Sequence, residues 1–518
     1  MPRPAGSALE VNVLGSSLPA KVEATIRRHG LLPQGSSVLI ACSGGPDSMA
    51  LLGVLAALRP QFSWTLTAAY IDHGLRPEAA AEGEHVRQTA AELGVAAVAR
   101  RLPGDLHSLK GDSLQALARR ERYKMLLAIA GECGAEFIAT GHTADDQAET
   151  VLMRILRGTG FQGLGAIKYI NGPIRRPLLD ARREETEAYC RISRLSPVLD
   201  KSNLKDDYLR NRLRHRLMPM LAEINTNYVT ALCRLAETAQ VENAWLEQLT
   251  MDAAGRIGMR EDGGWWCRSR DFAALPTALK RRVLRWLIAA AGDGGDGGDA
   301  CNDDWWPWAR MGESESTYEH IVKLEELLSA GRTGAALHLP GGLTACLEKG
   351  GFWIGRTTTT EYYEVTPPLP GEMAIPYTLF TLSLKLVEGT QDALSEIQRS
   401  GRRPPGQPGS RLEEHEPVPW RPEEKCEYLD WEAIAGLIKL RNRRPGDCYQ
   451  PMGMSGRKKV QDILVDLGIP RRWRDRLPVL ADDDGIIWMA GVRGAERVKV
   501  TPATRVMLEI RLQVLHKP

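Results

Sequence analysis

The sequence lacks the features of secreted and membrane proteins. Its 518 residues include nine cysteines, none of them in a CxxC pair, which argues against a disulfide-rich or zinc-binding protein. The longest clean apolar run, residues 49–58, is far shorter than the ~20 residues that a membrane-spanning helix needs. Arg3 and Glu10 lie near the N-terminus without a sustained apolar block, so no signal peptide is expected. We therefore expect a soluble cytoplasmic protein with reduced thiols and no membrane partner.

An excess of charge of one sign is also absent. Lys plus Arg is 67 and Asp plus Glu is 65, a net charge of +2 that excludes a histone-like or polyacidic chain. Positive and negative charges do not balance in every part of the chain, because residues 439–476 contain eleven Lys or Arg and only four Asp. Tyr449 and Trp473 interleave with these basic residues. This composition suits RNA phosphates and occasional base stacking, although a solvated face of a small domain is the alternative.

The first part of the chain predicts an α/β fold. Short apolar runs typical of buried strands cover residues 37–41, 65–71, 95–100 and 136–140. Helical patterns separate them at residues 48–58, 79–93, 113–130 and 144–157. This alternation predicts a doubly wound, mainly parallel sheet. Ligands of such sheets bind beyond the carboxyl ends of the strands, so the motifs at that edge are the candidates for a site.

The alternation ends near residue 225, where amphipathic helices begin. We predict three domains: an α/β domain over residues 1–222, a mainly helical middle domain over 223–357, and a small mixed, strand-rich C-terminal domain over 358–518 with its core at about 438–515. A Gly- and Asp-rich stretch at 292–308 reads as a surface insertion, and a Pro-rich stretch at 402–422 as a connection.

The sequence SGGPDS, Ser43–Ser48, directly follows the first predicted strand. Gly44 and Gly45 let the backbone approach an anion, and Ser43 and Ser48 add hydroxyl donors near the free amides of the next helix. No GK[ST] follows, so this is not a Walker loop. Asp47 would repel phosphate unless a cation lay between the two, which predicts Mg²⁺ at Asp47. The alternative is an ordinary Gly-Pro turn capped by Ser48.

Two further motifs belong to the same predicted edge. DHGLR at residues 72–76 follows the second strand, where Asp72 and His73 could meet a nucleoside; a structural histidine is an equally good explanation of His73. Arg119 and Arg122 lie three residues apart on the third helix. An arginine there could neutralise charge that develops on phosphate, or the two could belong to a solvated basic face.

GHTADDQAET, residues 141–150, follows the fourth strand. Asp145, Asp146 and Glu149 cluster in the first turns of the next helix, after Gly141 and His142. Helix capping explains one carboxylate at this position but not three. The others could serve as a metal ligand, as a general base, or as the binding site of a cationic substrate.

The motifs together resemble a known family. SGGPDS resembles the signature of the PP-loop ATP pyrophosphatases, which have an adenine nucleotide alpha hydrolase-like fold. The order of the motifs along the chain resembles tRNA(Ile)-lysidine synthetases in particular. The resemblance covers about the first 220 residues well and the last 80 fairly well, and it is carried by DHGLR at 72–76, GHTADDQAETVLMRILRG at 141–158, RPL at 176–178, DKSN at 200–203, YLRNRLRHRLMP at 208–219 and RNRRPGDCYQPMG at 441–453.

The resemblance implies an ATP-dependent ligase. Such an enzyme adenylates the wobble cytidine of the CAU anticodon of tRNA(Ile), and L-lysine then displaces AMP to give lysidine, which changes codon reading from AUG to AUA. The implied ligands are ATP, Mg²⁺, L-lysine and tRNA(Ile). The middle and C-terminal domains are expected to contact the tRNA. The oligomeric state is left open, with a homodimer among the alternatives.

The resemblance also assigns roles to residues. The implied catalytic residues are Asp47, Arg122 and Asp146, with the metal at Asp47. The implied ATP-binding residues are Ser43, Gly44, Gly45, Pro46, Asp47, Ser48, Asp72, His73, Gly141 and His142. Asp145 and Glu149 are candidates for handling lysine or the base. The candidates for tRNA binding are Arg210, Arg212, Arg441, Arg443, Lys458 and Lys459.

Two other classes of function stay in view. Another PP-loop enzyme, such as a tRNA thiolase or an amidotransferase-type synthetase, is one; the chain has neither paired cysteines nor a glutaminase signature. A non-catalytic RNA-binding protein with a degenerate nucleotide fold is the other. Binding alone would not require acids at Asp47 and Asp146, which argues against it.

Overall fold

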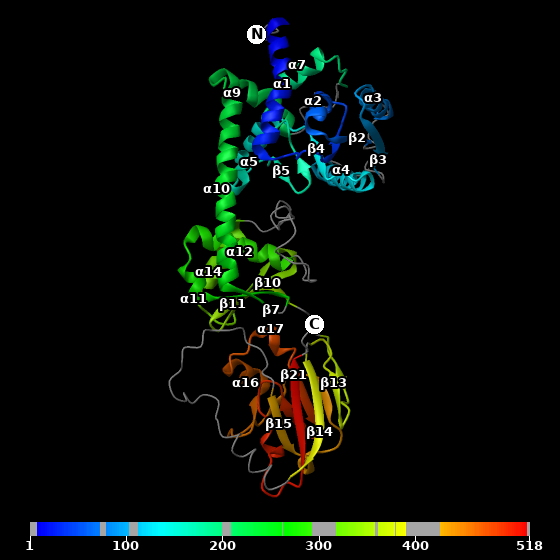
Figure 1. The fold of residues 1–518 in the computed structure, drawn as a ribbon. Coiled ribbons are helices and arrows are strands. Elements are labelled where there is room, and N and C mark those ends of the chain that lie inside the picture. Colours follow the sequence, from blue (N-terminus) through cyan, green and yellow to red (C-terminus); the bar gives the residue numbers. More distant parts are fainter. Residues whose placement is uncertain are drawn as a thin grey trace. The chain divides into compact units, whose positions relative to one another are not determined.

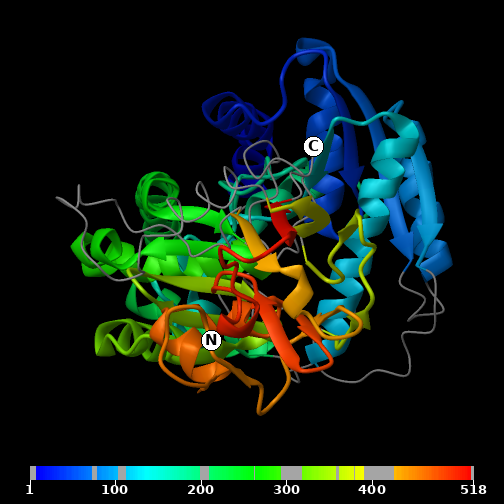
Figure 2. The same cartoon turned by 90° about the horizontal axis from the view of Figure 1, so that it is seen from below.

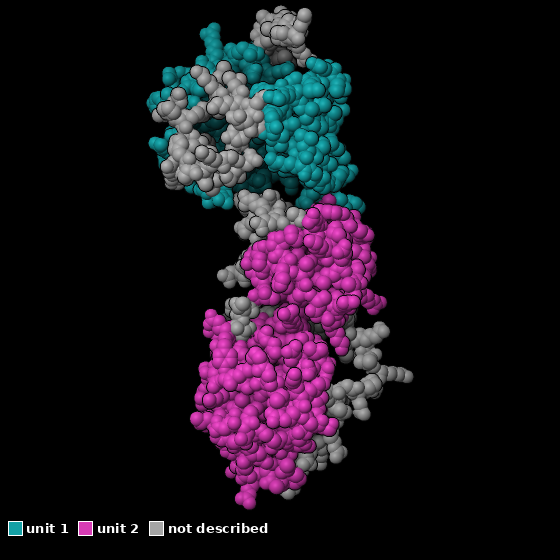
Figure 3. Space-filling model, turned by 180° about the vertical axis from the view of Figure 1, so that it is seen from behind, with its two compact units in different colours: residues 1–246 teal, residues 247–518 magenta. Residues whose placement is uncertain are grey.

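The computed structural model divides into two compact units, residues 1–246 and 247–518 (Figure 3). The boundary lies within the long helix α10, Tyr228–Ile257, drawn in green in Figure 1. The structure describes residues 8–72, 79–102, 112–198, 209–261, 263–292, 318–357, 361–378, 380–389 and 425–514. His73, the DKSN motif at 200–203, most of the 292–308 stretch and all of the 402–422 stretch lie outside these residues. The finer domain boundaries at 222 and 357 stay predictions.

The first unit is built on a six-stranded sheet with the order β3-β2-β1-β4-β6-β5. Figures 1 and 2 show this sheet together with the helices around it. All neighbouring pairs are parallel except β5 with β6. The strands are β1 Ser37–Ala41, β2 Thr65–Asp72, β3 Ala96–Arg101, β4 Phe137–Thr140, β5 Ile170–Asn171 and β6 Ile174–Arg175. The predicted α/β fold is confirmed.

Helices cover both faces of this sheet, which explains the uninterrupted apolar character of β1. Val38 and Ile40 contribute to one core cluster, with residues of α1, α2, α3 and α7, whereas Leu39 contributes to a second cluster with residues of α4. A strand buried on both faces has no polar alternation. The helices are α1 Ala8–His29, α2 Pro46–Phe62, α3 Ala79–Glu92, α4 Asp112–Cys133, α5 Ala144–Leu156, α6 Phe161–Leu164, α7 Arg183–Ile192, α8 Leu209–Arg212, a π-helical turn Leu213–Leu217 and α9 Met218–Ile224.

The second unit begins with helices packed on a sheet that the sequence analysis did not predict. Its five antiparallel strands have the order β7-β8-β11-β10-β9. The amphipathic helices expected after residue 225 are present, with α12 and α14 among them. The elements are β7 Gly258–Glu261, β8 Gly264–Arg268, α11 Ser269–Ala274, α12 Thr277–Gly292, α14 Tyr318–Ala330, β9 Ala336–Leu339, β10 Leu343–Glu348 and β11 Gly351–Arg356.

The C-terminal part is strand-rich, as predicted. Two four-stranded sheets, β12-β16-β19-β20 and β13-β14-β21-β15, share one hydrophobic core with the short helices α16 and α17. The elements are β12 Glu364–Val365, β13 Gly371–Ala374, β14 Phe380–Glu388, β15 Lys425–Asp430, β16 Lys439–Asn442, β17 Cys448–Tyr449, β18 Lys458–Lys459, α16 Val460–Asp466, α17 Arg471–Arg474, β19 Pro478–Asp482, β20 Gly485–Met489 and β21 Val506–Val514. Among the described residues, no helix is long and apolar enough to cross a membrane.

One close backbone contact in the first unit joins the loops that follow β1 and β4. A Cβ atom added to Gly141 would lie 3.1 Å from the backbone carbon and oxygen of Asp47 and from the backbone nitrogen of Ser48. Because these are backbone atoms at the start of α2, they cannot give way as a flexible side chain would. Gly141 therefore allows the two loops to meet.

We expect Gly141→Ala to lower the free energy of unfolding by about 1–3 kcal/mol, because the added methyl group forces the two loops apart. Gly131 in α4 is the control, since an added Cβ there meets nothing within 4 Å. Gly131→Ala is expected to be neutral or stabilising by up to about 1 kcal/mol, because alanine is the better helix former. Urea unfolding followed by circular dichroism measures both, and equal stability of the two variants would contradict the assignment.

Candidate active site

The loop between β1 and α2 is fixed by its own serines. The Ser48 hydroxyl donates to the Gly45 carbonyl at 2.9 Å and accepts from the Ser43 backbone N–H at 3.1 Å. Gly44 has a φ of +81°, a backbone conformation that disfavours any residue with a Cβ atom. Pro46 is the first residue of α2. The Ser43–Ser48 segment thus begins a helix at the carboxyl edge of the sheet, which is the geometry of an anion-binding turn.

Asp47 lies in the first turn of α2 and is held by residues of α7. The Thr186 hydroxyl donates to Asp47 Oδ1 at 2.6 Å, and Arg183 Nε lies 3.4 Å from Asp47 Oδ2. Burial raises the pKa of Asp47 above its usual range, and the charge of Arg183 and the hydrogen bond from Thr186 only partly oppose this rise. The carboxylate is therefore charged at a cost that a bound cation would reduce.

Asp146 has two roles at the start of α5. Its Oδ2 atom accepts from the Thr143 backbone N–H at 2.9 Å, and its own backbone N–H donates to Thr143 Oγ1 at 3.4 Å. These two bonds form a capping box. Oδ1 faces away from the cap, toward Arg183 and Arg210, each of which donates to it at 3.1 Å. One oxygen orders the helix and the other belongs to the site.

The other two predicted acids are also paired with arginines. Asp145 accepts from the Arg182 side chain at 3.2–3.3 Å and from the Arg183 backbone N–H at 2.7 Å. Glu149 is fully buried, and Arg210 and Arg214 each bind it at 2.7 Å. Burial alone would raise the pKa of Glu149, but the hydrogen bonds and charges of these arginines outweigh burial and lower it.

Arg183 joins Asp47, which follows β1, to the acids that follow β4. Its guanidinium lies 3.4 Å from Asp47, 3.1 Å from Asp146 and 3.5 Å from Glu149. Burial opposes the charge of Arg183, yet the neighbouring carboxylates raise its pKa, Asp146 and Asp47 most strongly. The structure thus brings Asp47 and Asp146 together from separate strand ends. The sequence analysis missed Arg182, Arg183 and Arg214; the only available signal was their place near the RPL motif and within the 208–219 motif.

A cluster of positive charge lies beside the acids. The Arg119 and Arg122 guanidinium carbons are 5.3 and 5.6 Å from the centre of the Tyr123 ring. Burial lowers the pKa of His142 well below its usual range, and the charges of Arg176, Arg119, Arg122 and Arg210 lower it further. Arg119 and Arg122, predicted on the third helix, lie on α4 of the structure. Their charges lower the pKa of His142 in the loop after β4, and His142 is neutral at pH 7. Its Nδ1 atom is 3.0 Å from Thr140 Oγ1.

Asp72 lies at the end of β2, next to β1, with its carboxylate 3.9 Å from Arg101. It is thus at the predicted edge of the sheet, and its role with ATP stays a prediction.

The residues predicted to bind tRNA differ in their exposure. Arg212 and Lys459 are exposed. Arg441 is only 7% exposed and binds both oxygens of Asp447, at 2.8 and 3.0 Å, so its charge is balanced inside the fold. Arg210 belongs to the acidic cluster of the first unit. The remaining two form ion pairs, Arg443 with Asp475 and Lys458 with Asp466.

The acids fit a magnesium ion only together with a nucleotide. Within the described ranges, no group of three or more His, Cys, Asp or Glu residues could hold a metal ion. Mg²⁺ commonly takes one or two carboxylates and completes its shell with water and substrate phosphates. Asp47 and Asp146 both bind one positive group, Arg183, and this donor set fits such a shared ion. All eight cysteines that the structure describes are free thiols.

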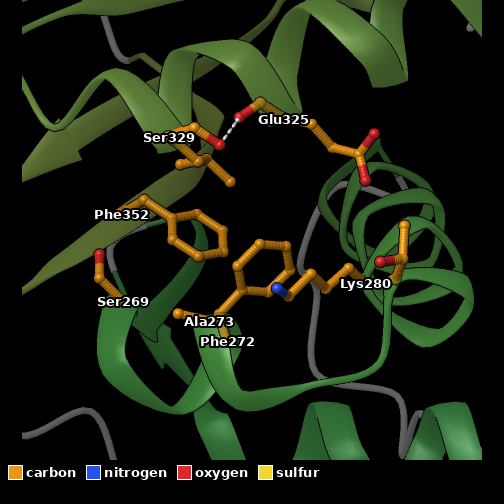
Figure 4. A pocket seen from close by; sticks show the side chains of 9 residues that line it. Ser269, Phe272, Ala273, Lys280, Glu325, Ser329 and Phe352 are labelled. Atoms are coloured by element: carbon orange, nitrogen blue, oxygen red, sulfur yellow. Dashed lines mark hydrogen bonds between the residues drawn. The ribbon is translucent and has the colours of Figure 1, made fainter.

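The second unit contains a cavity of about 360 Å³, and no predicted site residue lines it (Figure 4). The Phe272 and Phe352 rings meet edge to face in it, with centroids 5.1 Å apart. Glu325 at its rim binds Arg281 at 2.9 Å. Nothing in this cavity resembles the charged cluster of the first unit.

Comparison with known proteins gives two family matches. Residues 18–221 match the PP-loop domain family, and residues 438–510 match the TilS substrate C-terminal domain. A tRNA(Ile)-lysidine synthase of Symbiobacterium thermophilum is 36% identical over 520 residues, which cover 96% of this chain and 98% of that protein. A protein of the same name from Geobacter sulfurreducens is 32% identical over 504 residues, which cover 95% and 96%. The predicted PP-loop fold is thereby confirmed.

We expect Arg183→Met to destabilise the protein by about 2 kcal/mol at pH 7, because three carboxylates lose a shared counter-ion. The pKa of Asp47 is already raised and would rise further. A carboxyl with a raised pKa in the folded state costs stability when it is ionised, and this cost disappears as the pH falls through its pKa. The difference between wild type and variant should therefore narrow from pH 7 toward pH 4.

Urea unfolding at several pH values measures this difference. Arg182→Met is the matched control, because the Arg182 side chain pairs with Asp145 alone among these acids. The Arg182 variant should leave the titration of Asp47 unchanged. A destabilisation by Arg183→Met that is independent of pH would refute the shared counter-ion.

Proposed function

The chain belongs to the tRNA(Ile)-lysidine synthase family, and we propose that it ligates L-lysine to the wobble cytidine of the CAU anticodon of tRNA(Ile). ATP would be cleaved to AMP and pyrophosphate, and the modified tRNA would read AUA instead of AUG. The observation that carries the proposal is the meeting of Asp47 and Asp146 around one guanidinium, beside the Ser43–Ser48 loop. A nucleotide-binding protein without catalysis has no need for this arrangement.

In the first step, the carbonyl oxygen of the cytosine ring attacks the α-phosphorus of ATP. The bond from that phosphorus to the oxygen bridging to the β-phosphate breaks, and pyrophosphate leaves with the electron pair. The backbone amides and hydroxyls of Ser43–Ser48 would hold the phosphates, and Arg122 would neutralise charge on them. Asp47 would hold a Mg²⁺ ion, which supplies further neutralisation of phosphate oxygens.

In the second step, the lysine ε-amine attacks the activated ring carbon and AMP leaves with the former carbonyl oxygen. An ε-ammonium has a reference pKa of about 10.4, so it must lose a proton before it can attack. Asp146 Oδ1 is the carboxylate oxygen best placed to accept this proton, since Oδ2 caps α5. Asp145, Asp146 and Glu149 are all paired with arginines, so a substrate ammonium would reach any of them only if an arginine moved.

The tRNA would bind both units. The wobble base has to leave the anticodon stack to reach the carboxyl edge of the sheet, as is general in recognition of single-stranded RNA. Arg212 in the first unit and Lys458, Lys459 and Arg443 in the second are the proposed phosphate contacts. Arg441 is better explained by the fold, given its buried pair with Asp447. A tRNA substrate and the free thiols of the described cysteines both support the proposed location in the cytoplasm.

Asp47→Asn tests the proposal directly. The protein is incubated with ATP, Mg²⁺, radiolabelled lysine and unmodified CAU-anticodon tRNA. Wild type should transfer lysine to the tRNA and release AMP and pyrophosphate, whereas Asp47→Asn should lose at least about 10²-fold of the rate, because a charge that acts on the phosphates is removed. Asp252→Asn, an exposed position on α10, is the control and should match wild type. ATP cleavage without lysine transfer would favour another PP-loop activity.

Lys458→Glu combined with Lys459→Glu tests the RNA contacts. Reversing two charges at a phosphate-binding surface should weaken tRNA binding about tenfold or more and reduce its salt dependence, while ATP affinity stays unchanged. The charge-matched control is Lys385→Glu with Arg505→Glu, two exposed residues of β14 and the loop before β21. Filter binding at two salt concentrations gives the affinities. Equal effects of the two double variants would reject this surface.

A further inference from the structure

Arg176 carries a buried positive charge for which the described residues supply no acid. It directly follows β6, and it is only 5% exposed. Its Nη1 atom donates to the Lys168 carbonyl at 2.5 Å, but its Nε atom forms no hydrogen bond of good geometry. A neutral carbonyl does not balance a guanidinium. Within the described ranges, no carboxylate forms an ion pair with Arg176.

Arg119 and Arg122 add to this uncompensated charge. Both lie over the Tyr123 ring, and neither has a carboxylate partner among the residues that the structure describes. The Tyr123 hydroxyl is buried near Arg176 and, like Arg176 Nε, is without a well-formed hydrogen bond. Burial would raise the pKa of Tyr123, but the charges of Arg119, Arg176 and Arg122 lower it. Three guanidinium groups thus act on one buried hydroxyl group.

The neighbouring acidic cluster makes the contrast clear. There each carboxylate has one or more arginine partners, and each of Arg182, Arg183, Arg210 and Arg214 has a carboxylate. A buried charge without a partner costs free energy, so proteins rarely keep one without a function. Uncompensated guanidinium groups with free donors are the arrangement that receives an anion, and Arg binds phosphate especially well through its planar fork.

The topology brings this arginine cluster to the nucleotide. β1, β4 and β6 are adjacent and parallel, so the Ser43–Ser48 loop, His142 and Arg176 follow the same ends of neighbouring strands. The charges of Arg119, Arg122 and Arg176 lower the pKa of His142, which agrees with this placement. An anion at the cluster would thus lie at the edge where the ATP phosphates are expected.

We propose that Arg176 and Arg119, together with Arg122, complete the phosphate site of the Ser43–Ser48 loop and hold the pyrophosphate portion of ATP as it leaves. The inference rests on the proposed function for the identity of the reaction, but the anion site itself is measured independently of it. Arg176 provides the buried charge, and Arg119, which is exposed, closes the site from the side of α4.

The test measures binding of inorganic pyrophosphate with Mg²⁺ by calorimetry, and thermal unfolding with and without it. Arg176→Met and Arg119→Met should each weaken pyrophosphate binding about tenfold or more, the loss of one charged contact. Without ligand, Arg176→Met should unfold at the same or a higher temperature than wild type, because an unpaired buried charge has been removed. With ligand, its stabilisation by pyrophosphate should largely disappear.

Arg175→Met is the matched control. Arg175 precedes Arg176, but its guanidinium binds the carbonyls of Leu31 and Gly172, so its removal should leave pyrophosphate affinity unchanged. Wild-type pyrophosphate affinity in both test variants would overturn the proposal. So would a loss confined to tRNA affinity, which would assign the cluster to an RNA phosphodiester. If Arg176→Met does not fold, Arg119→Met decides.

Failure of the inference and failure of the proposed function are distinguishable. Suppose that the wild-type protein forms no lysidine and that the two variants bind pyrophosphate more weakly than wild type. This result would refute the function and leave the anion site intact. Lysidine formation by a wild type whose variants retain full pyrophosphate affinity would refute the anion site alone.

Discussion

The geometry of the first unit depends on one guanidinium shared by three carboxylates. Arg183 is the first residue of α7, Asp47 lies in the first turn of α2, and Asp146 and Glu149 lie in α5. A single side chain therefore joins three helices that start at the same sheet edge. Without a cation between them, these carboxylates would repel one another in a site of low solvent access. The ion pairs that balance the charge of the site therefore also hold the starts of the three helices in place.

This constraint separates the site into two parts of different character. In the acidic part, every carboxylate is matched by arginines, and the pKa of Glu149 is lowered. In the arginine part, Arg176, Arg119 and Arg122 surround Tyr123 and the neutral His142 without an acid among the described residues. An enzyme that binds both a polyphosphate and an amine, as we propose for this chain, would need surfaces of both signs, and the sheet edge has both on neighbouring strand ends.

The sequence was a good guide to the position of side chains that the local backbone places, and a poor guide to side chains that are placed by pairing. Asp47 and Asp146 could be found because each follows a recognisable strand and begins a helix. Arg183 could not, since its partners lie 34 to 136 residues away along the chain. The same limit affects charge counts: Arg441 and Arg472 add to the basic stretch at 439–476, yet both are buried in ion pairs, with Asp447 and Glu348. The sheet of β7 to β11 was missed although its strands are as long as β1 and β4, because consecutive strands pair as antiparallel hairpins and lack the strand–helix alternation of the first sheet.

The division into two charged parts would also give the two proposed steps an order. The proposed first step expels pyrophosphate, which the arginine part would hold while the adenylated base awaits the amine. The proposed second step requires an ammonium to lose its proton, and the acidic part already holds Arg183. A lysine ammonium would have to compete with Arg183 and Arg210 for Asp146 Oδ1, because each of these guanidinium groups donates to it. A proton taken up by Asp146 Oδ1 would leave a neutral amine ready to attack, and Arg183 would then keep Asp47 and Glu149 as its charged partners.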